Sequence, residues 1–405
     1  MPTVNALLTN FNGPNYHGLV HQTTPSDTPF TTALMGTAVG GGEAVINSRT
    51  FEWQTFDLRA AGQNTVVDGD SAGTGEHRSR QNVFNVLQTH REDIDVAYER
   101  LAQIGQFDGQ NISGGNPVSD EEAWQLTQMW KQIKRDIEFS LINGSYVLPA
   151  DNNTAAQTRG ILEAITTNVE DASEEVATLA TSAAADDIFD TDAAHGLAVG
   201  DDFYLTDLSG GAGLSEDTRY YVTSVPTSTS FTASATKGGA SLDWTTDITD
   251  GNVVKYGEPD EESVGDLMQS AYDNGGLQES SMGLLIVNSG LKRWLTKIFV
   301  KDKNIETRTR NIGGANVQVV ETDFGQLGIM LNRYIPQGTL AAVSLDQCKP
   351  HFRFVPGKGV MFSEPLGKDG ASNKTQLYAS VGLEYGFEAA HAKNEFFTAN
   401  APAAE

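Results

Sequence analysis

The chain has 405 residues, enough for two or three domains, and 39% apolar and 20% charged residues are typical of a globular protein. Acidic residues outnumber basic ones by 53 to 27, and the formal net charge of −26 excludes a protein that binds nucleic acid by bulk electrostatics. The same charge argues against binding to an anionic membrane surface. The one cysteine, Cys348, excludes an intrachain disulfide and a cysteine-based zinc site. We expect neither a transmembrane helix nor a signal peptide, because no apolar run approaches about 20 residues and the first residues lack a basic region followed by an apolar core.

Residues 1–50 are rich in Gly, Pro, Asn and Thr, with apolar residues scattered singly. Such a segment cannot bury a core of its own. It is therefore either a loose terminus or a segment that lies along a neighbour. His17 and His21, the closest pair among seven dispersed histidines, lie here, and a metal role for them is the weaker reading.

Apolar and polar residues alternate from Phe51 to Phe56 and again over 93–98, which predicts two strands. Residues 58–80 between them are polar and rich in glycine. We predict that the two strands pair as one extended hairpin with a long tip. A hairpin alone is marginal in water, so this one should lie on something else. Residues 68–79 begin like a calcium loop but lack its later ligands, so a solvated tip is the better reading.

A long helix is predicted over 119–143. Ser119 and Glu122 have the spacing of a capping box, and Asn143-Gly144 ends the pattern. Apolar residues recur every three or four positions, which predicts one buried face. The expected core positions of this helix are Leu126, Trp130, Ile133, Ile137 and Leu141.

Residues 171–255 differ in composition from the rest of the chain, because Ala, Ser, Thr, Asp and Gly dominate. Short strand patterns occur at 203–205, 220–223 and 230–233. Turn residues separate them, which indicates a small all-β module. The flanking sequences share one character, so we read the module as an insertion into a host domain.

The remaining sequence alternates between helix and strand patterns. Helices are predicted at 260–274 and around 291–298, and strands at 284–287, 317–321, 329–331 and 340–345. The longest predicted strand covers 376–388, where the odd positions from Leu377 to Phe387 are apolar and should face a core.

Motifs that carry catalysis are missing from this sequence. It contains no Gly-x-Ser-x-Gly, no His-Glu-x-x-His and no phosphate-binding Walker loop. Carboxylates are so frequent that no pair stands out as general acid and base. We therefore expect no enzyme activity, no catalytic residue, no cofactor and no metal site.

Several segments, in this order and spacing, resemble the major capsid proteins of tailed bacteriophages with the Hong Kong 97-type fold, and more closely the SU-ten-like family. The segments that carry the resemblance are residues 51–58, 128–144, 158–160, 321–325 and 366–374 followed by the strand at 376–388. The resemblance implies an α+β fold of the Hong Kong 97-like phage capsid type, to which the small all-β domain is added.

The resemblance also implies a division of the chain. It would comprise an N-terminal arm (1–50), an extended loop (51–98), a peripheral domain with the long spine helix (99–170), the inserted surface domain (171–255), an axial domain (256–345), and the return strand of the peripheral domain with the C-terminal tail (346–405). The insertion would project from the capsid exterior. Candidate contacts between subunits are Phe51, Trp53, Asp57, Arg59, Glu76, Arg78, Arg80 and Arg91.

The function implied is that of a self-assembling shell protein, forming hexamers and pentamers of an icosahedral head that encloses double-stranded DNA without reading its sequence. The implied partners are a separate scaffolding protein, a portal, and a decoration protein or host surface at the insertion, with no membrane partner and with assembly in the bacterial cytoplasm. Two alternatives remain open: the shell of an encapsulin-like compartment, and an adhesive β module on an unrelated structural scaffold.

Overall fold

The computed structural model describes residues 22–37, 44–71, 73, 75–102, 118, 120–151, 153–277, 283–302, 308–312, 315–322, 324–367 and 370–402. The chain divides into two compact units. Unit 1 combines residues 1–31, 40–159 and 350–384, and unit 2 combines 32–39, 160–349 and 385–405. Each unit is thus built from segments far apart in sequence, and helix α1 (Pro29–Thr37) passes from the first to the second.

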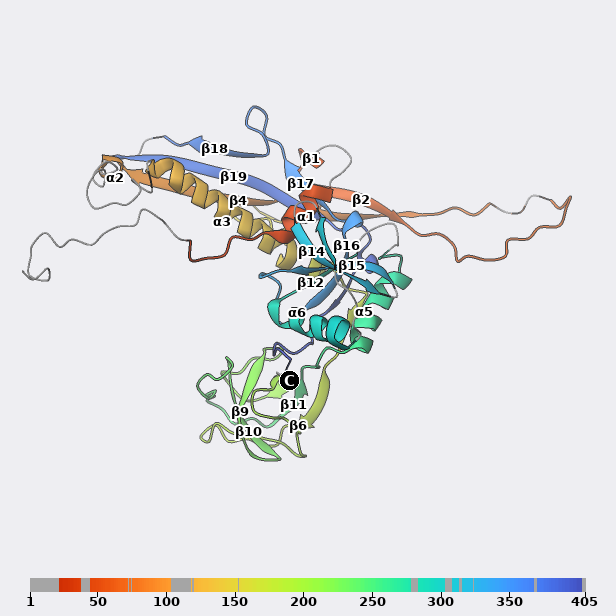
Figure 1. Cartoon of the computed structure of the whole chain (residues 1–405), viewed down its shortest axis with the longest axis vertical. Helices are drawn as coiled ribbons and strands as arrows, with labels where there is room; N and C mark the ends of the chain where they lie inside the picture. Colours follow the sequence, from red (N-terminus) through yellow and green to blue (C-terminus); the bar gives the residue numbers. More distant parts are fainter. Residues whose placement is uncertain are drawn as a thin grey trace, which may run out of the picture. The chain divides into compact units, whose positions relative to one another are not determined.

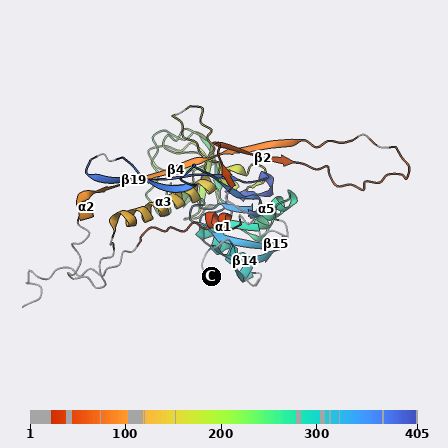
Figure 2. The same ribbon diagram turned by 90° about the horizontal axis from the view of Figure 1, so that it is seen from above.

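Unit 1 contains a five-stranded sheet in the order β1-β17-β19-β18, with β4 also paired to β19. Helix α3 lies along β4 and β19 (Figures 1 and 2). Strands β2 and β3 form a separate two-stranded ribbon. The elements are β1 (Ala44–Ile46), β2 (Thr50–Phe56), β3 (Arg80–Val86), β4 (Gln88–Ala97), α2 (Tyr98–Ala102), α3 (Glu121–Asn143), β17 (Lys349–Arg353), β18 (Met361–Pro365) and β19 (Ser372–Glu384).

The predicted hairpin partner is wrong. Strand β2 pairs antiparallel with β3, from Thr50 opposite Val86 to Phe56 opposite Arg80. The second predicted strand is β4, and its partner is β19, from Gln88 opposite Val381 to Ala97 opposite Ser372. Alternation of apolar and polar residues identifies a strand and its buried face, but it carries no information about which strand lies beside it.

The long helix begins later than predicted. It starts at Glu121, and the Asp120 side chain caps it by accepting from the Ala123 backbone N–H at 3.2 Å. The predicted capping box pairs Glu122 with Ser119, which lies outside the described residues, so that part stays a prediction. Of the predicted core positions, Ile133, Ile137 and Leu141 are fully buried and Leu126 and Trp130 are half-buried.

Unit 2 contains two sheets. The first has seven strands in the order β13-β14-β15-β12-β16-β20-β5, and the second has six in the order β6-β11-β8-β9-β10-β7. The helical elements are α4 (Ile161–Ala164), α5 (Glu261–Asp273), α6 (Ser289–Thr296), a π-helical turn (Lys297–Asp302) and two 3-10 turns (Leu345–Gln347 and Glu388–Ala390).

The strands of the seven-stranded sheet are β5 (Val169–Glu170), β12 (Gly283–Val287), β13 (Arg308–Ile312), β14 (Ala315–Thr322), β15 (Gly325–Leu331), β16 (Leu340–Ser344) and β20 (Ala392–Asn394). The strands of the six-stranded sheet are β6 (Glu174–Thr178), β7 (Phe189–Asp190), β8 (Asp202–Ser209), β9 (Tyr220–Thr227), β10 (Ser230–Ser234) and β11 (Asp250–Lys255). The six-stranded sheet has an aromatic core of its own, in which the Phe189 ring stacks on Phe231 and contacts Trp244.

Strand β19 ends four residues before its predicted end. Gly386 has a left-handed φ of 61°, which turns the chain out of the strand direction. Phe387 is consequently exposed, although the sequence pattern placed it on the buried face. Leu377, Ala379, Val381 and Leu383 are buried as predicted.

Two histidines, His391 and His90, are buried in the core of their units. The His391 ring accepts a hydrogen bond from the Ser344 backbone N–H at 3.1 Å, and its Nε2 lies 2.8 Å from the Tyr385 carbonyl oxygen. Burial lowers the pKa of His391, and it lowers the pKa of His90 on β4 to about 4. Both rings are therefore neutral at physiological pH.

Candidate functional site

The ribbon of β2 and β3 continues into a long loop, residues 57–79, with no helix or strand in its described part (Figures 1 and 2). Four large apolar side chains lie at its start and along it with little cover. The exposed fractions are 65% for Phe56, 68% for Leu58, 72% for Val66 and 77% for Val67. Several large apolar side chains left in water along one segment are typical of a surface that a partner covers.

The foot of the ribbon is packed tightly into unit 1. Phe51 is buried, and its ring lies 4.6 Å from the ring of His351 on β17. A side chain at Gly382 of β19 would bring its Cβ within 2.7 Å of the Phe51 ring, so this close approach requires glycine. His351 Nε2 in turn lies 2.5 Å from the Glu384 carboxylate. The exposed loop thus extends from a fixed base.

The Asn85 side chain links three segments at the base of the ribbon, namely β3, β19 and the chain at Arg159, and every donor and acceptor of its amide group is used. Its amide nitrogen donates to the carbonyl oxygens of Arg159 at 3.1 Å and Leu383 at 2.7 Å. Its Oδ1 accepts from the backbone N–H groups of Val86 at 2.8 Å and Arg159 at 2.9 Å. The side chain is fully buried, so each of these bonds replaces one to water.

We predict that Asn85→Asp lowers the free energy of unfolding by about 3 kcal/mol, because the carboxylate loses both donors and faces two carbonyl oxygens out of water. Urea denaturation of the unassembled subunit measures this. The control is Asn82→Asp on the same strand, where the side chain is exposed and bonds only to Glu52 at 3.3 Å. This control should cost less than about 1 kcal/mol. Equal losses for both variants would contradict the role assigned to Asn85.

Glu138 on helix α3 is a buried carboxylate that holds the first turn of α1. It accepts from the backbone N–H groups of Phe30 at 2.8 Å and Thr31 at 2.7 Å, and from the Thr31 hydroxyl at 2.6 Å. The first N–H groups of a helix have no partner within it, and a negative charge there also suits the helix dipole. Glu138 is 0% exposed, so this cap is made entirely out of water.

The sequence-predicted contact residues take different positions. Phe51 is buried within its own chain and Trp53 is half-buried. The charged candidates are all exposed: Asp57, Arg59, Glu76, Arg78, Arg80 and Arg91. Arg78 pairs with Glu76 at 2.8 Å, and Arg91 lies 3.4 Å from Asp93. Exposed pairs such as these add little stability and can exchange partners cheaply.

Asn85 and Glu138 were missed as candidates. The signal available for Glu138 was its place on the helix, between Ile137 and Ile142 on an otherwise apolar arc. A carboxylate on a buried face must find donors, so it marks a contact. Asn85 carried no such signal, because asparagine within a polar strand segment is ordinary.

Each unit has a surface hollow among its described residues. One, of about 450 Å³, is lined by the start of α6, residues 331–337 and the C-terminal segment, and the other, of about 510 Å³, by β4 and the first half of α3. The second holds Asp93, Asp95, Arg100 and Glu121, and Arg100 lies 3.8 Å from Glu121. Within the described part of the chain, no group of three His, Cys, Asp or Glu residues is placed to bind a metal ion. No helix in that part is long and apolar enough to span a bilayer.

Comparison with known proteins gives a family and a fold. The family model for the SU10 major capsid protein matches residues 3–396. A chain of the cyanophage A-1(L) capsid asymmetric unit is similar over 97% of this chain and 99% of that chain, at 10% identity and a TM-score of 0.51. No curated protein sequence matches the chain.

Two further solved structures are similar at lower scores. The capsid of cyanophage P-SCSP1u covers 97% of this chain and 98% of its own at 10% identity, with a TM-score of 0.48. The holo-SrpI encapsulin of Synechococcus elongatus PCC 7942 is similar over 95% of this chain and 96% of its own chain, at 8% identity and a TM-score of 0.45.

Proposed function

The chain belongs to the SU10 major capsid protein family and is a major capsid protein of a tailed phage, and from this premise we propose that neighbouring copies bind through the β2–β3 ribbon. The exposed apolar side chains of the loop that follows β2 would be buried against the next copy. The copies would associate as hexamers and pentamers into the icosahedral head. The α+β fold is that of phage capsid proteins. The family also favours a phage head over the encapsulin shell and the adhesive module that the sequence left open.

The observation that carries this proposal is the exposed apolar loop on a fixed base. Phe56, Leu58, Val66 and Val67 are each about two-thirds exposed or more. Burying a fully exposed side chain of this size gains about 1.5–3 kcal/mol. A second copy of the chain is the partner that a shell protein meets at every position, and a repeated modest contact is enough to close a stable shell.

The division of labour between segments is also proposed. Residues 1–50 would be the arm, 51–98 the extended loop, 99–170 and 346–405 the peripheral domain, and 256–345 the axial domain. The six-stranded sheet supports reading 171–255 as an inserted domain, which would project from the outer surface and meet a decoration protein or the host. Scaffolding protein, portal and enclosed double-stranded DNA would be the other partners, with assembly in the bacterial cytoplasm.

Negative-stain microscopy of the purified protein, together with its mass from light scattering, tests the proposal. We expect closed shells, or rings of five and six, either alone or on co-expression with the phage's scaffolding protein. A discrete monomer or dimer that forms no shell on concentration, with the scaffold, or with phage lysate would contradict it.

A further inference from the structure

Residues 396–400, close to the end of the described part of the chain, contact both sheets of unit 2. We call residues 396–400 the C-terminal strap. On one side, the Phe397 backbone N–H donates to the Gly338 carbonyl at 3.2 Å, and the Asn400 carbonyl accepts from the Trp294 indole at 2.8 Å. Gly338 lies two residues before β16 of the seven-stranded sheet, and Trp294 belongs to α6. The strap is thus attached to the body built around that sheet.

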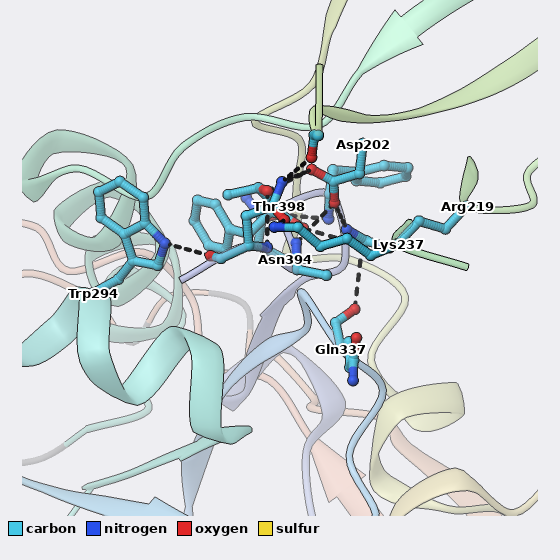
Figure 3. A network of polar contacts seen from close by, with 12 residues as sticks. Asp202, Arg219, Lys237, Trp294, Gln337, Asn394 and Thr398 are labelled. Atoms are coloured by element: carbon cyan, nitrogen blue, oxygen red, sulfur yellow. Dashed lines mark hydrogen bonds and ion pairs between the residues drawn. The ribbon is translucent and has the colours of Figure 1, made fainter. Parts of the chain in front are cut away.

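The other side of the strap is attached to the six-stranded sheet, mainly through one carboxylate. Asp202, the first residue of β8, accepts from the Thr398 hydroxyl at 2.5 Å, the Ala399 backbone N–H at 2.8 Å and the Asn400 amide at 3.2 Å (Figure 3). The Asn400 amide also donates to the Gly200 carbonyl at 2.9 Å. Asp202 is 2% exposed, so its charge is balanced by these donors and by one arginine.

That arginine is Arg219, which also reaches both sheets. It pairs with Asp202 and donates to the carbonyl oxygens of Gln337 at 3.2 Å and Phe397 at 3.0 Å (Figure 3). Its guanidinium lies 3.6 Å from the centre of the Tyr256 ring. Burial raises the pKa of Tyr256 to about 12, so the phenol stays neutral beneath the cation.

Gly338 is packed closely against the strap and the Arg219 guanidinium. Gly338 has a left-handed φ of 80°, and a Cβ there would approach the Phe397 carbonyl oxygen to 2.1 Å and the Arg219 guanidinium to 2.4 Å. Removing one partner from a buried, charged hydrogen-bond network leaves the other groups unpaired out of water, and this costs more free energy than the bond itself contributes. The contact between the two sheets is therefore specific in its geometry.

From these contacts we propose that the C-terminal strap, through Asp202 and Arg219, fixes the six-stranded sheet rigidly to the rest of unit 2. Without it, the sheet would remain joined through its two connectors, residues 171–173 and 256–260, and would move as a tethered body. The inference concerns how the sheet is held, and it stands whether or not the sheet has the exterior role proposed above.

Hydrogen exchange of the subunit tests the proposal, because the backbone N–H groups of residues 397–399 donate to Gly338, Gly257 and Asp202 outside the strap. The Asn400 backbone N–H donates to the Thr398 hydroxyl within the strap. We expect Asp202→Ala to speed exchange at 397–400 by about tenfold or more. Exchange at core positions of the six-stranded sheet, such as Val222 and Phe231, should stay as in the wild type. Thr398→Val, which removes a donor from the strap and leaves the sheet's sequence intact, should act in the same direction.

The matched control is Asp201→Ala. Asp201 precedes Asp202 directly, but its partners, Lys255 at 2.6 Å and the Ala198 backbone N–H at 3.0 Å, both belong to the six-stranded sheet region. It should leave exchange at 397–400 unchanged. Unchanged exchange in Asp202→Ala and Thr398→Val would overturn the proposal. So would faster exchange in the strap after Asp201→Ala, because the effect would then reflect general loosening of the sheet.

Discussion

Replacing Glu138 with alanine is expected to lower the free energy of unfolding of the subunit by about 3–5 kcal/mol. The carboxylate accepts three short hydrogen bonds from Phe30 and Thr31, all out of water. Alanine supplies no acceptor, and the donors at the first turn of α1 have no partner within their own helix. Urea denaturation of the unassembled subunit measures the loss, and hydrogen exchange at the amides of Phe30 and Thr31 locates it.

Two companion variants make the Glu138 result specific. Glu138→Gln keeps one acceptor oxygen and turns the other into a donor that faces donors, so it should fall between the wild type and alanine. Asp136→Ala removes a carboxylate two residues earlier on the same helix, where the side chain is exposed, and should cost less than about 1 kcal/mol. If Asp136→Ala costs as much as Glu138→Ala, the effect belongs to the helix in general and the anchoring role is wrong.

The elements that the sequence predicted well are those whose signals are local. Helix α5 runs from Glu261 to Asp273 and is capped by Asp260 with Ser263, within one residue of the prediction. Strand β12 is buried at every position, as its continuous apolar run indicates. Capping and periodicity are read within a few residues, so the rest of the fold has little influence on them.

What the sequence could not predict is which distant segments meet. Strand β4 has a clear alternating pattern, yet its partner β19 begins at Ser372, far along the chain. The two units are each assembled from separated stretches, and nothing in a local pattern orders them. The family resemblance grouped residues 99–170 with 346–405, and that division stays a prediction. The family match confirms the family itself.

The same limit applies to the site. Exposed loop residues such as Arg78 could be identified from the polar, glycine-rich composition of their segment. In contrast, Asn85, Glu138 and Asp202 act through partners that lie far away in sequence. Asp202 sits in a stretch rich in Asp, where no single carboxylate stands out from the others. Its burial follows from the position of residues 398–400, which the sequence does not reveal.

Replacing Phe56, Leu58, Val66 and Val67 together with serine is expected to abolish shell formation while leaving the subunit folded. These side chains contribute almost nothing to the subunit's own core, so the free energy of unfolding should change by only about 0.5 kcal/mol for each substitution or less. In a shell, each would be covered by a neighbouring copy. Losing about 4 kcal/mol from every such contact raises the protein concentration needed for assembly by roughly a thousandfold.

The control for the serine variant uses the same loop. Gln63, Asn64 and His77 are exposed polar residues, and replacing all three with serine changes the loop's sequence without removing apolar surface. Light scattering against protein concentration, with microscopy of the product, compares the two variants. The proposal requires that only the first fails to assemble. If both assemble like the wild type, the apolar loop is not buried between subunits. If both fail, the loop acts through its conformation, and the apolar contact is not the cause.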